Sequence, residues 1–258
     1  MKVRVLGCHG GVAPGYQTSC YQINDDFLID CGSVCSSLSP KEQGEITDIF
    51  ITHPHLDHIK DICFILENTY SPSRETLKLH STKEILDDIK NHLLNDIIWP
   101  DFSKIYLDPS TRKKPSLEYI PITSTIDIHG IKVTPFPVNH PGNAVGYLID
   151  DGSKQVVFSG DTGENTSLWQ TANHCSNLKA VFSEISFPSK FSDLARASGH
   201  YTLEHLKADH QQLTKQEIPI YIAHFKPLFL RDLLNEFQKE APSQFVLMHE
   251  NDSFEFST

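Results

Sequence analysis

The chain has 258 residues, of which 39% are hydrophobic, and its formal net charge is -11. This length and composition exclude a largely disordered chain and predict a single folded domain over residues 1–258. The acidic charge argues against nucleic acid as a partner, because nucleic-acid-binding proteins carry a basic surface and the one compact basic stretch here is residues 112–114.

Residues 1–7 predict a first strand and lack the long apolar core of a secretory signal. No run approaches the ~18 apolar residues that a membrane-spanning helix needs. The six cysteines are scattered without Cys-x-x-Cys pairing, which favours reduced thiols, although a disulfide between Cys31 and Cys35 stays open. We therefore expect a cytoplasmic protein with no membrane partner.

Strands dominate the first quarter of the chain, with turn residues between them, and we expect them over residues 2–6, 19–23, 27–31 and 48–52. A helical segment follows over residues 59–67. Residues 82–94 predict an amphipathic helix, because Ile85, Leu86, Ile89 and Leu93 recur at helical spacing.

The second half repeats this mixture without repeating the sequence. Strands are expected over residues 132–137, 144–149, 155–159, 180–184 and 218–223, and helices over residues 203–213 and 228–237. Two strand-rich halves with interspersed helices predict two stacked sheets covered by helices. They do not show the regular alternation of a doubly wound parallel sheet.

The most informative segment is Thr52-His53-Pro54-His55-Leu56-Asp57-His58, which directly follows a predicted strand. Imidazole and carboxylate groups are ligands that Zn, Fe and Mn accept. In an extended chain His53 and His55 point to the same side and can reach one ion. Asp57 and His58 fall on the predicted turn and can reach a second. The pattern His-x-His-x-Asp-His is expected to arise by chance in about one chain in a few hundred.

Three further candidate ligands stand at the ends of predicted strands: His140, Asp161 and His224. Asp161 lies between Gly160 and Gly163, and glycine lets the backbone approach an ion closely. A single strand-end histidine is more often structural than a metal ligand. Four strand-end sites along one chain favour a metal centre over a polar loop of surface histidines.

The histidine motif and the spacing of the later ligands resemble the metallo-β-lactamase superfamily over nearly the whole chain. The resemblance implies an α/β fold of the αββα sandwich type and two divalent ions, zinc first, with manganese or iron as alternatives. It assigns His53, His55 and His140 to one ion. Asp57, His58 and His224 would hold the other, with Asp161 as the bridge. Asp30 would support the histidine loop.

Several stretches resemble class II cyclic-nucleotide phosphodiesterases: residues 55–58, residues 91–93 (Asn-His-Leu) followed by 95–102 (Asn-Asp-Ile-Ile-Trp-Pro-Asp-Phe), and residues 184–188, 199–202 and 222–227. The chain departs from that family at residue 203, where leucine replaces the proline of Gly-His-Leu-Thr-Pro. Thr202 still predicts a good helix N-cap. The resemblance implies catalytic roles for Asp57 and His200, with His200 also binding the phosphate; the alternative is that His200 caps the following helix.

The sequence thus predicts a dinuclear phosphodiesterase that opens 3′,5′-cyclic nucleotides, cyclic AMP first, to 5′-nucleotides by attack of a metal-bridging hydroxide. The expected partner is this small-molecule substrate, and a homodimer stays open. The rival enzymes are a tRNA 3′-end-processing endonuclease, which needs a basic surface, and a thioester or lactone hydrolase. A catalytically silent binding protein on the same fold is the rival outside enzymes, but such a protein usually loses ligands.

Overall fold

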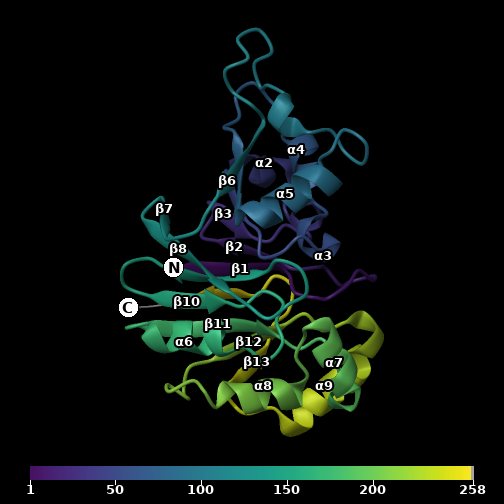
Figure 1. The fold of residues 1–258 in the computed structure, drawn as a ribbon, viewed down its shortest axis with the longest axis vertical. Coiled ribbons are helices and arrows are strands. Elements are labelled where there is room, and N and C mark those ends of the chain that lie inside the picture. Colours follow the sequence, from purple (N-terminus) through teal and green to yellow (C-terminus); the bar gives the residue numbers. More distant parts are fainter. Residues whose placement is uncertain (257–258) are drawn as a thin grey trace.

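A computed structural model describes residues 1–256, and within them two seven-stranded sheets are stacked between outer layers of helices (Figure 1). The first sheet has the strand order β14-β1-β2-β3-β4-β5-β6, and the second has the order β13-β12-β11-β10-β9-β8-β7. Each sheet is mixed, with antiparallel pairs toward one end and parallel pairs toward the other. This arrangement is the αββα sandwich that the sequence predicts.

The strands of the first sheet are β1 Lys2–Gly7, β2 Cys20–Ile23, β3 Phe27–Ile29, β4 Asp48–Phe50, β5 Leu77–Ser81, β6 Leu117–Pro121 and β14 Ser253–Glu255. Those of the second are β7 Ile126–Ile128, β8 Ile131–Pro137, β9 Val145–Asp150, β10 Gln155–Phe158, β11 Leu178–Glu184, β12 Ile220–Ala223 and β13 Phe245–Leu247. Strand β14, near the C-terminus, pairs with β1, so the chain's two ends meet in one sheet.

The helices that follow the first-sheet strands are α1 Val34–Ser37, α2 Pro40–Glu45, α3 Leu56–Ile59, α4 Ile62–Asn68 and α5 Lys83–His92. Those of the second half are α6 Thr166–His174, α7 Ser192–Ser198, α8 Leu203–His210 and α9 Leu230–Glu240. Helices α2, α4 and α5 lie on the outer side of the first sheet, and α6, α8 and α9 lie on the outer side of the second (Figure 1). Within residues 1–256, none of these helices is long and apolar enough to cross a membrane.

Aromatic side chains from both sheets join the two layers. Tyr21 of β2 lies 5.5 Å from Phe158 of β10 between ring centroids, and Phe50 of β4 lies 5.6 Å from Tyr147 of β9. All four side chains are buried. Burial of such rings is strongly favourable, because each removes a large apolar area from water. The stacking of the sheets therefore fixes how the ends of their strands face one another.

Several predicted boundaries were wrong by two or more residues. The strand expected over residues 48–52 ends at Phe50, and the helix expected over residues 59–67 is two short helices, α3 and α4. Strands β5, β6, β7, β13 and β14 and helices α1, α2, α6 and α7 were not predicted. Several of these strands have only three residues, too few for a clear alternation of apolar and polar side chains. All six cysteines are free thiols, so Cys31 and Cys35 are not bridged.

Candidate metal centre

The histidine motif begins where β4 ends, at the edge where the two sheets face each other. Residues 51–55 continue as extended chain, and His55 stands as the N-cap of α3 with ψ of 146°. Asp57 and His58 therefore lie on the first turn of a helix rather than on the turn that the sequence predicts. The ligand atoms of the motif fall into two groups, and the rings of His53 and His58 lie next to each other, 4.2 Å apart between centroids.

The first group consists of three imidazoles. Nδ1 of His55 lies 3.0 Å from Nε2 of His53 and 3.2 Å from Nε2 of His140. His53 and His140 are buried, whereas His55 is exposed. His140 follows strand β8 of the second sheet, so this group spans both sheets.

The second group contains two imidazoles and two carboxylates. Nε2 of His224 lies 3.4 Å from Nε2 of His58 and 3.2 Å from Oδ2 of Asp57. Oδ1 of Asp161 lies 3.3 Å from Nε2 of His58. His58, Asp161 and His224 are buried, and Asp57 is partly open to solvent.

Asp161 stands between the two groups. Its Oδ2 lies 3.6 Å from Nε2 of His53 in the first group and 3.2 Å from Nε2 of His224 in the second. One carboxylate facing both groups is the arrangement that a bridging ligand requires. Gly160 connects the end of β10 to Asp161, and its φ of 60° is a left-handed conformation that favours glycine.

The donor set fits divalent metal ions. Three imidazole nitrogens that converge at 3.0–3.2 Å repel one another unless a proton or a cation lies between them. Zn–N bonds of about 2.0–2.1 Å in a tetrahedron place neighbouring ligand nitrogens about 3.3 Å apart, close to the observed separations. The second group has two imidazoles and two carboxylates, which suit Zn, Fe or Mn.

In each of the four buried histidines of the metal centre, Nδ1 faces away from the other candidate ligands and has a partner that fixes the orientation of the ring. Nδ1 of His58 lies 2.7 Å from Oδ2 of Asp30, and Nδ1 of His53 lies 3.1 Å from Oγ1 of Thr52. Nδ1 of His140 lies 2.8 Å from the carbonyl oxygen of Gly199, and Nδ1 of His224 lies 2.7 Å from Oγ of Ser186. Such partners leave Nε2 free to face an ion.

Burial and neighbouring charges set the protonation of the centre. Burial places the pKa of His53 well below the ordinary value and lowers that of His140, and partial desolvation of the His55 ring lowers its pKa as well. Burial would raise the pKa of Asp161, but His224 and His58 outweigh it and hold that pKa well below the ordinary range. His53, His55 and His140 are therefore neutral imidazoles beside an ionised Asp161, which are the states that bind a metal ion. Burial lowers the pKa of His58, but Asp161 and Asp30 outweigh it and hold that pKa well above the ordinary value, so metal binding would release a proton from this ring.

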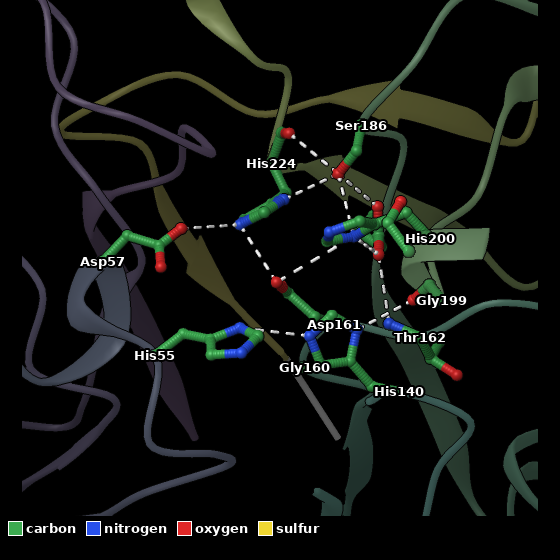
Figure 2. A network of polar contacts seen from close by, with 12 residues as sticks. His55, Asp57, His140, Gly160, Asp161, Thr162, Ser186, Gly199, His200 and His224 are labelled. Atoms are coloured by element: carbon green, nitrogen blue, oxygen red, sulfur yellow. Dashed lines mark hydrogen bonds and ion pairs between the residues drawn. The ribbon is translucent and has the colours of Figure 1, made fainter. Parts of the chain in front are cut away.

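His200 lies beside both groups and contacts a carboxylate. Its Nδ1 is 2.6 Å from Oε1 of Glu184 and 3.2 Å from Oγ of Ser186, and its ring centroid is 4.9 Å from that of His140 (Figure 2). Burial lowers the pKa of His200, but Glu184 outweighs it, and the pKa lies above the ordinary value. Thr202, not His200, caps helix α8, because its side chain accepts a hydrogen bond from the backbone N–H of His205.

The backbone at His224 has a conformation that is uncommon for a residue with a side chain. Its φ is 66°, and its N–H donates to the carbonyl oxygen of Cys8 at 2.6 Å. A Cβ at Gly10 would lie 2.7 Å from the His224 ring, so only glycine leaves room for this ring. The loop after β1 thus positions a candidate ligand that lies more than two hundred residues further along the chain.

The structure brings all seven predicted ligands and His200 to one edge of the two sheets. Sequence reasoning left Glu184 and Ser186 without roles, although both lie in the stretch of residues 184–188 that resembles the phosphodiesterases. The signal that could have identified them is their place at the end of β11, an apolar strand of the same sheet as those before Asp161 and His224. Asp30 contacts His58 as the resemblance implies.

The two stacked sheets and the histidine-rich edge between them define a protein of the metallo-β-lactamase fold. The metallo-β-lactamase fold protein YhfI from Bacillus subtilis is similar with a TM-score of 0.75 at 22% identity, over 98% of this chain and 99% of that chain. Unliganded yeast PDE1 is similar with a TM-score of 0.74 at 19% identity, over 98% of each chain.

The chain belongs to the family described as anti-Pycsar protein Apyc1, whose model matches residues 3–252. It is also 28% identical over 122 residues to a 3′,5′-cyclic-nucleotide phosphodiesterase of Schizosaccharomyces pombe. That match covers 47% of this chain and 32% of the relative, so the chain spans about a third of that protein. Endoribonucleases are among the other relatives. Phosphodiesterases and nucleases are thus both represented among the relatives.

Proposed function

We propose that the chain is a dinuclear metal-dependent phosphodiesterase that hydrolyses 3′,5′-cyclic nucleotides to 5′-nucleotides. The observation that carries this proposal is the position of the His200–Glu184 pair beside two adjoining groups of candidate ligands. Hydrolysis of a phosphodiester needs positive charge close to the phosphate oxygens and a proton for the leaving oxygen. This edge of the protein has groups suited to both tasks.

The candidate ligands have separate tasks in the proposal. His53, His55 and His140 hold one ion, Asp57, His58 and His224 hold the other, and Asp161 bridges them. When bound, the two ions would supply an activated water near neutral pH and neutralise charge on the phosphate oxygens. Zinc is the first candidate, with manganese and iron as alternatives. Asp57 is the ligand most open to solvent in its group.

His200 is the proposed acid. The raised pKa favours the protonated ring near neutral pH, because Glu184 stabilises the imidazolium through Nδ1. Nε2 then has a proton to donate to the 3′ oxygen as the bond from that oxygen to phosphorus breaks. The added water supplies the new oxygen on phosphorus, and the product is a 5′-monophosphate. A correctly placed acid contributes about 100- to 10,000-fold in rate.

Three comparisons support a cyclic nucleotide as the substrate class. The Schizosaccharomyces pombe relative is named a 3′,5′-cyclic-nucleotide phosphodiesterase, yeast PDE1 shares the fold, and the family is named for an anti-Pycsar protein. Cyclic AMP is the nucleotide that the resemblance to class II phosphodiesterases favours. The endoribonuclease relatives make RNA the main alternative, and the net charge of -11 argues against a polyanion.

The test begins with protein loaded with zinc or manganese. Metal content is measured by mass spectrometry, and hydrolysis is followed for the 3′,5′-cyclic forms of adenosine, guanosine, cytidine and uridine, for bis(p-nitrophenyl) phosphate and for a pre-tRNA. We expect at least two ions per chain and metal-dependent opening of a cyclic nucleotide, with cyclic AMP preferred. Removal of metal by a chelator should abolish turnover, and its return should restore it.

Three variants assign the roles. His58→Ala should lose metal and activity, whereas His200→Ala should retain metal and lose about 100-fold or more in turnover. His92→Ala removes an exposed histidine at the end of α5 and is the matched control for both. Hydrolysis of the generic diester alone would retain a hydrolase but contradict the cyclic-nucleotide substrate. Cleavage of the pre-tRNA alone would favour the endonuclease.

A further inference from the structure

A second set of side chains that could hold a metal ion lies beside the loop that contains His224. Cys8 and His9 follow strand β1, and Glu250 follows strand β13. Nδ1 of His9 lies 2.7 Å from Oε1 of Glu250 and 3.9 Å from Sγ of Cys8, and the three ligand atoms all lie within 4.8 Å of one another. Cys8 and His9 are buried, and the Glu250 side chain is 21% exposed.

The geometry excludes a catalytic relay through this histidine. In a relay, one ring nitrogen faces the nucleophile and the other faces the carboxylate. Here the thiol and the carboxylate both face Nδ1 of His9. Burial, with the nearby carboxylates of Glu250 and Asp252, also raises the pKa of the Cys8 thiol, which keeps it from acting as a free nucleophile.

The same geometry suits a cation. A zinc ion with bonds of about 2.3 Å to sulfur and 2.0–2.1 Å to nitrogen and oxygen sets the S···N separation near 3.6 Å and the N···O separation near 3.3 Å. The observed S···N separation of 3.9 Å is a few tenths of an ångström longer than this value. The observed N···O separation of 2.7 Å is about half an ångström shorter. The backbone N–H of Gln17 donates to Oε1 of Glu250 at 2.9 Å and holds this carboxylate in place.

A cavity of about 240 Å³ adjoins the cluster, and it is lined by apolar side chains such as Leu230, Leu234 and Met248. Among the residues that line it, Glu250 is acidic and none is lysine or arginine. No basic side chain among these lining residues therefore neutralises the negative charge of Glu250. A soft thiolate next to an imidazole and a carboxylate selects zinc over magnesium or calcium.

We propose that Cys8, His9 and Glu250 form a further zinc-class metal site, distinct from the dinuclear centre, with an open coordination position toward the cavity. On binding, the Cys8 thiol releases its proton to solvent, and the His9 imidazole carries its proton on Nε2 while Nδ1 holds the ion. The ion would tie the loop after β1 to the segment after β13. Because the carbonyl oxygen of Cys8 accepts from the N–H of His224, this tie would also hold the His224 loop.

Cobalt substitution tests the site without reference to activity. Thiolate ligation gives Co²⁺ a charge-transfer band in the near ultraviolet, and the ligands of the dinuclear centre include no sulfur, so the band reports this site alone. We expect the band in the wild-type protein and about one equivalent less Co²⁺ in Cys8→Ser. Cys175→Ser is the matched control, since Cys175 is equally buried and also contacts a backbone carbonyl.

A second variant keeps the test independent of the folding of Cys8→Ser. Glu250→Gln retains the size of the side chain and removes its charge, and it should weaken Co²⁺ binding at this site by at least about tenfold. Absence of the band in cobalt-loaded wild-type protein would overturn the proposal, as would a band of full strength in Cys8→Ser. Failure of the phosphodiesterase proposal would leave the band unchanged, so the two proposals are tested separately.

Discussion

Oδ2 of Asp30 lies 2.7 Å from Nδ1 of His58, and both side chains are almost completely buried. Asp30 itself has a φ of 59°, and its Oδ1 also accepts the backbone N–H of Thr52 at 2.8 Å. One carboxylate thus fixes both the start of the histidine motif and the ring orientation of a candidate ligand. Metal centres depend on such partners as well as on the ligands themselves.

Asp30→Asn should weaken metal binding by about 10- to 100-fold, because the carboxylate no longer orients His58. The loss would be measured by competition with a chelator of known affinity. Asp25→Asn, at an exposed position before β3, is the control and should bind metal like the wild type. Equal affinities in the two variants would contradict the supporting role of Asp30.

Glu184→Gln should change the pH dependence of hydrolysis. Glu184 raises the pKa of His200, and the proposed acid must be protonated, so the rate falls as the pH rises through that pKa. Without the carboxylate the pKa falls, and the alkaline limb of the profile of kcat/KM should move to lower pH. Metal content should stay unchanged. Glu204→Gln, at an exposed position on α8, should leave the limb where it is.

Gly10→Ala should destabilise the protein by about 1–3 kcal/mol and weaken its metal binding, because the added methyl group would overlap the His224 ring. Gly44→Ala is the contrasting control: Gly44 lies in helix α2 with open space around it. That change should stabilise by about 0.4–1 kcal/mol. Denaturant unfolding and metal analysis would measure both variants. Normal metal affinity in Gly10→Ala would show that the loop can move away.

His210 should make the metal-free protein sensitive to acid. Both of its ring nitrogens are buried without a hydrogen-bond partner in residues 1–256, and it packs on Trp169 and Phe245. Burial lowers its pKa, so below the ordinary value of about 6.5 the unfolded chain binds a proton that the folded chain does not. Its contribution to stability is therefore lost as the pH falls below about 6.5.

The test for His210 compares unfolding free energies across pH after metal removal. His210→Leu should flatten the decline below about pH 6.5 and add on the order of 1 kcal/mol at pH 5, because no polar ring remains buried. His92→Leu changes an exposed histidine and should follow the wild-type curve. Parallel curves for His210→Leu and the wild type would show that the His210 ring has no part in the acid sensitivity.

The sequence was sufficient to predict the sandwich and to single out the histidine motif as a set of candidate ligands. His53 and His55 follow an apolar strand at a spacing of two, and that local pattern can be read without a structure. The short strands at the sheet edges could not be predicted, because three residues carry almost no periodicity. The turn expected at Asp57 was wrong because this residue lies in the one-turn helix α3, which begins at Leu56.

Residue types and their order along the chain were determined by the sequence alone: imidazoles and carboxylates at strand ends, and glycines where an ion would approach the backbone. Only the tertiary structure decided which of them meet. His58 and His224 are separated by 166 positions, and Cys8 and Glu250 stand at opposite ends of the chain. Such pairs depend on how the two sheets stack and on β14 pairing with β1, which are long-range contacts that no local pattern encodes.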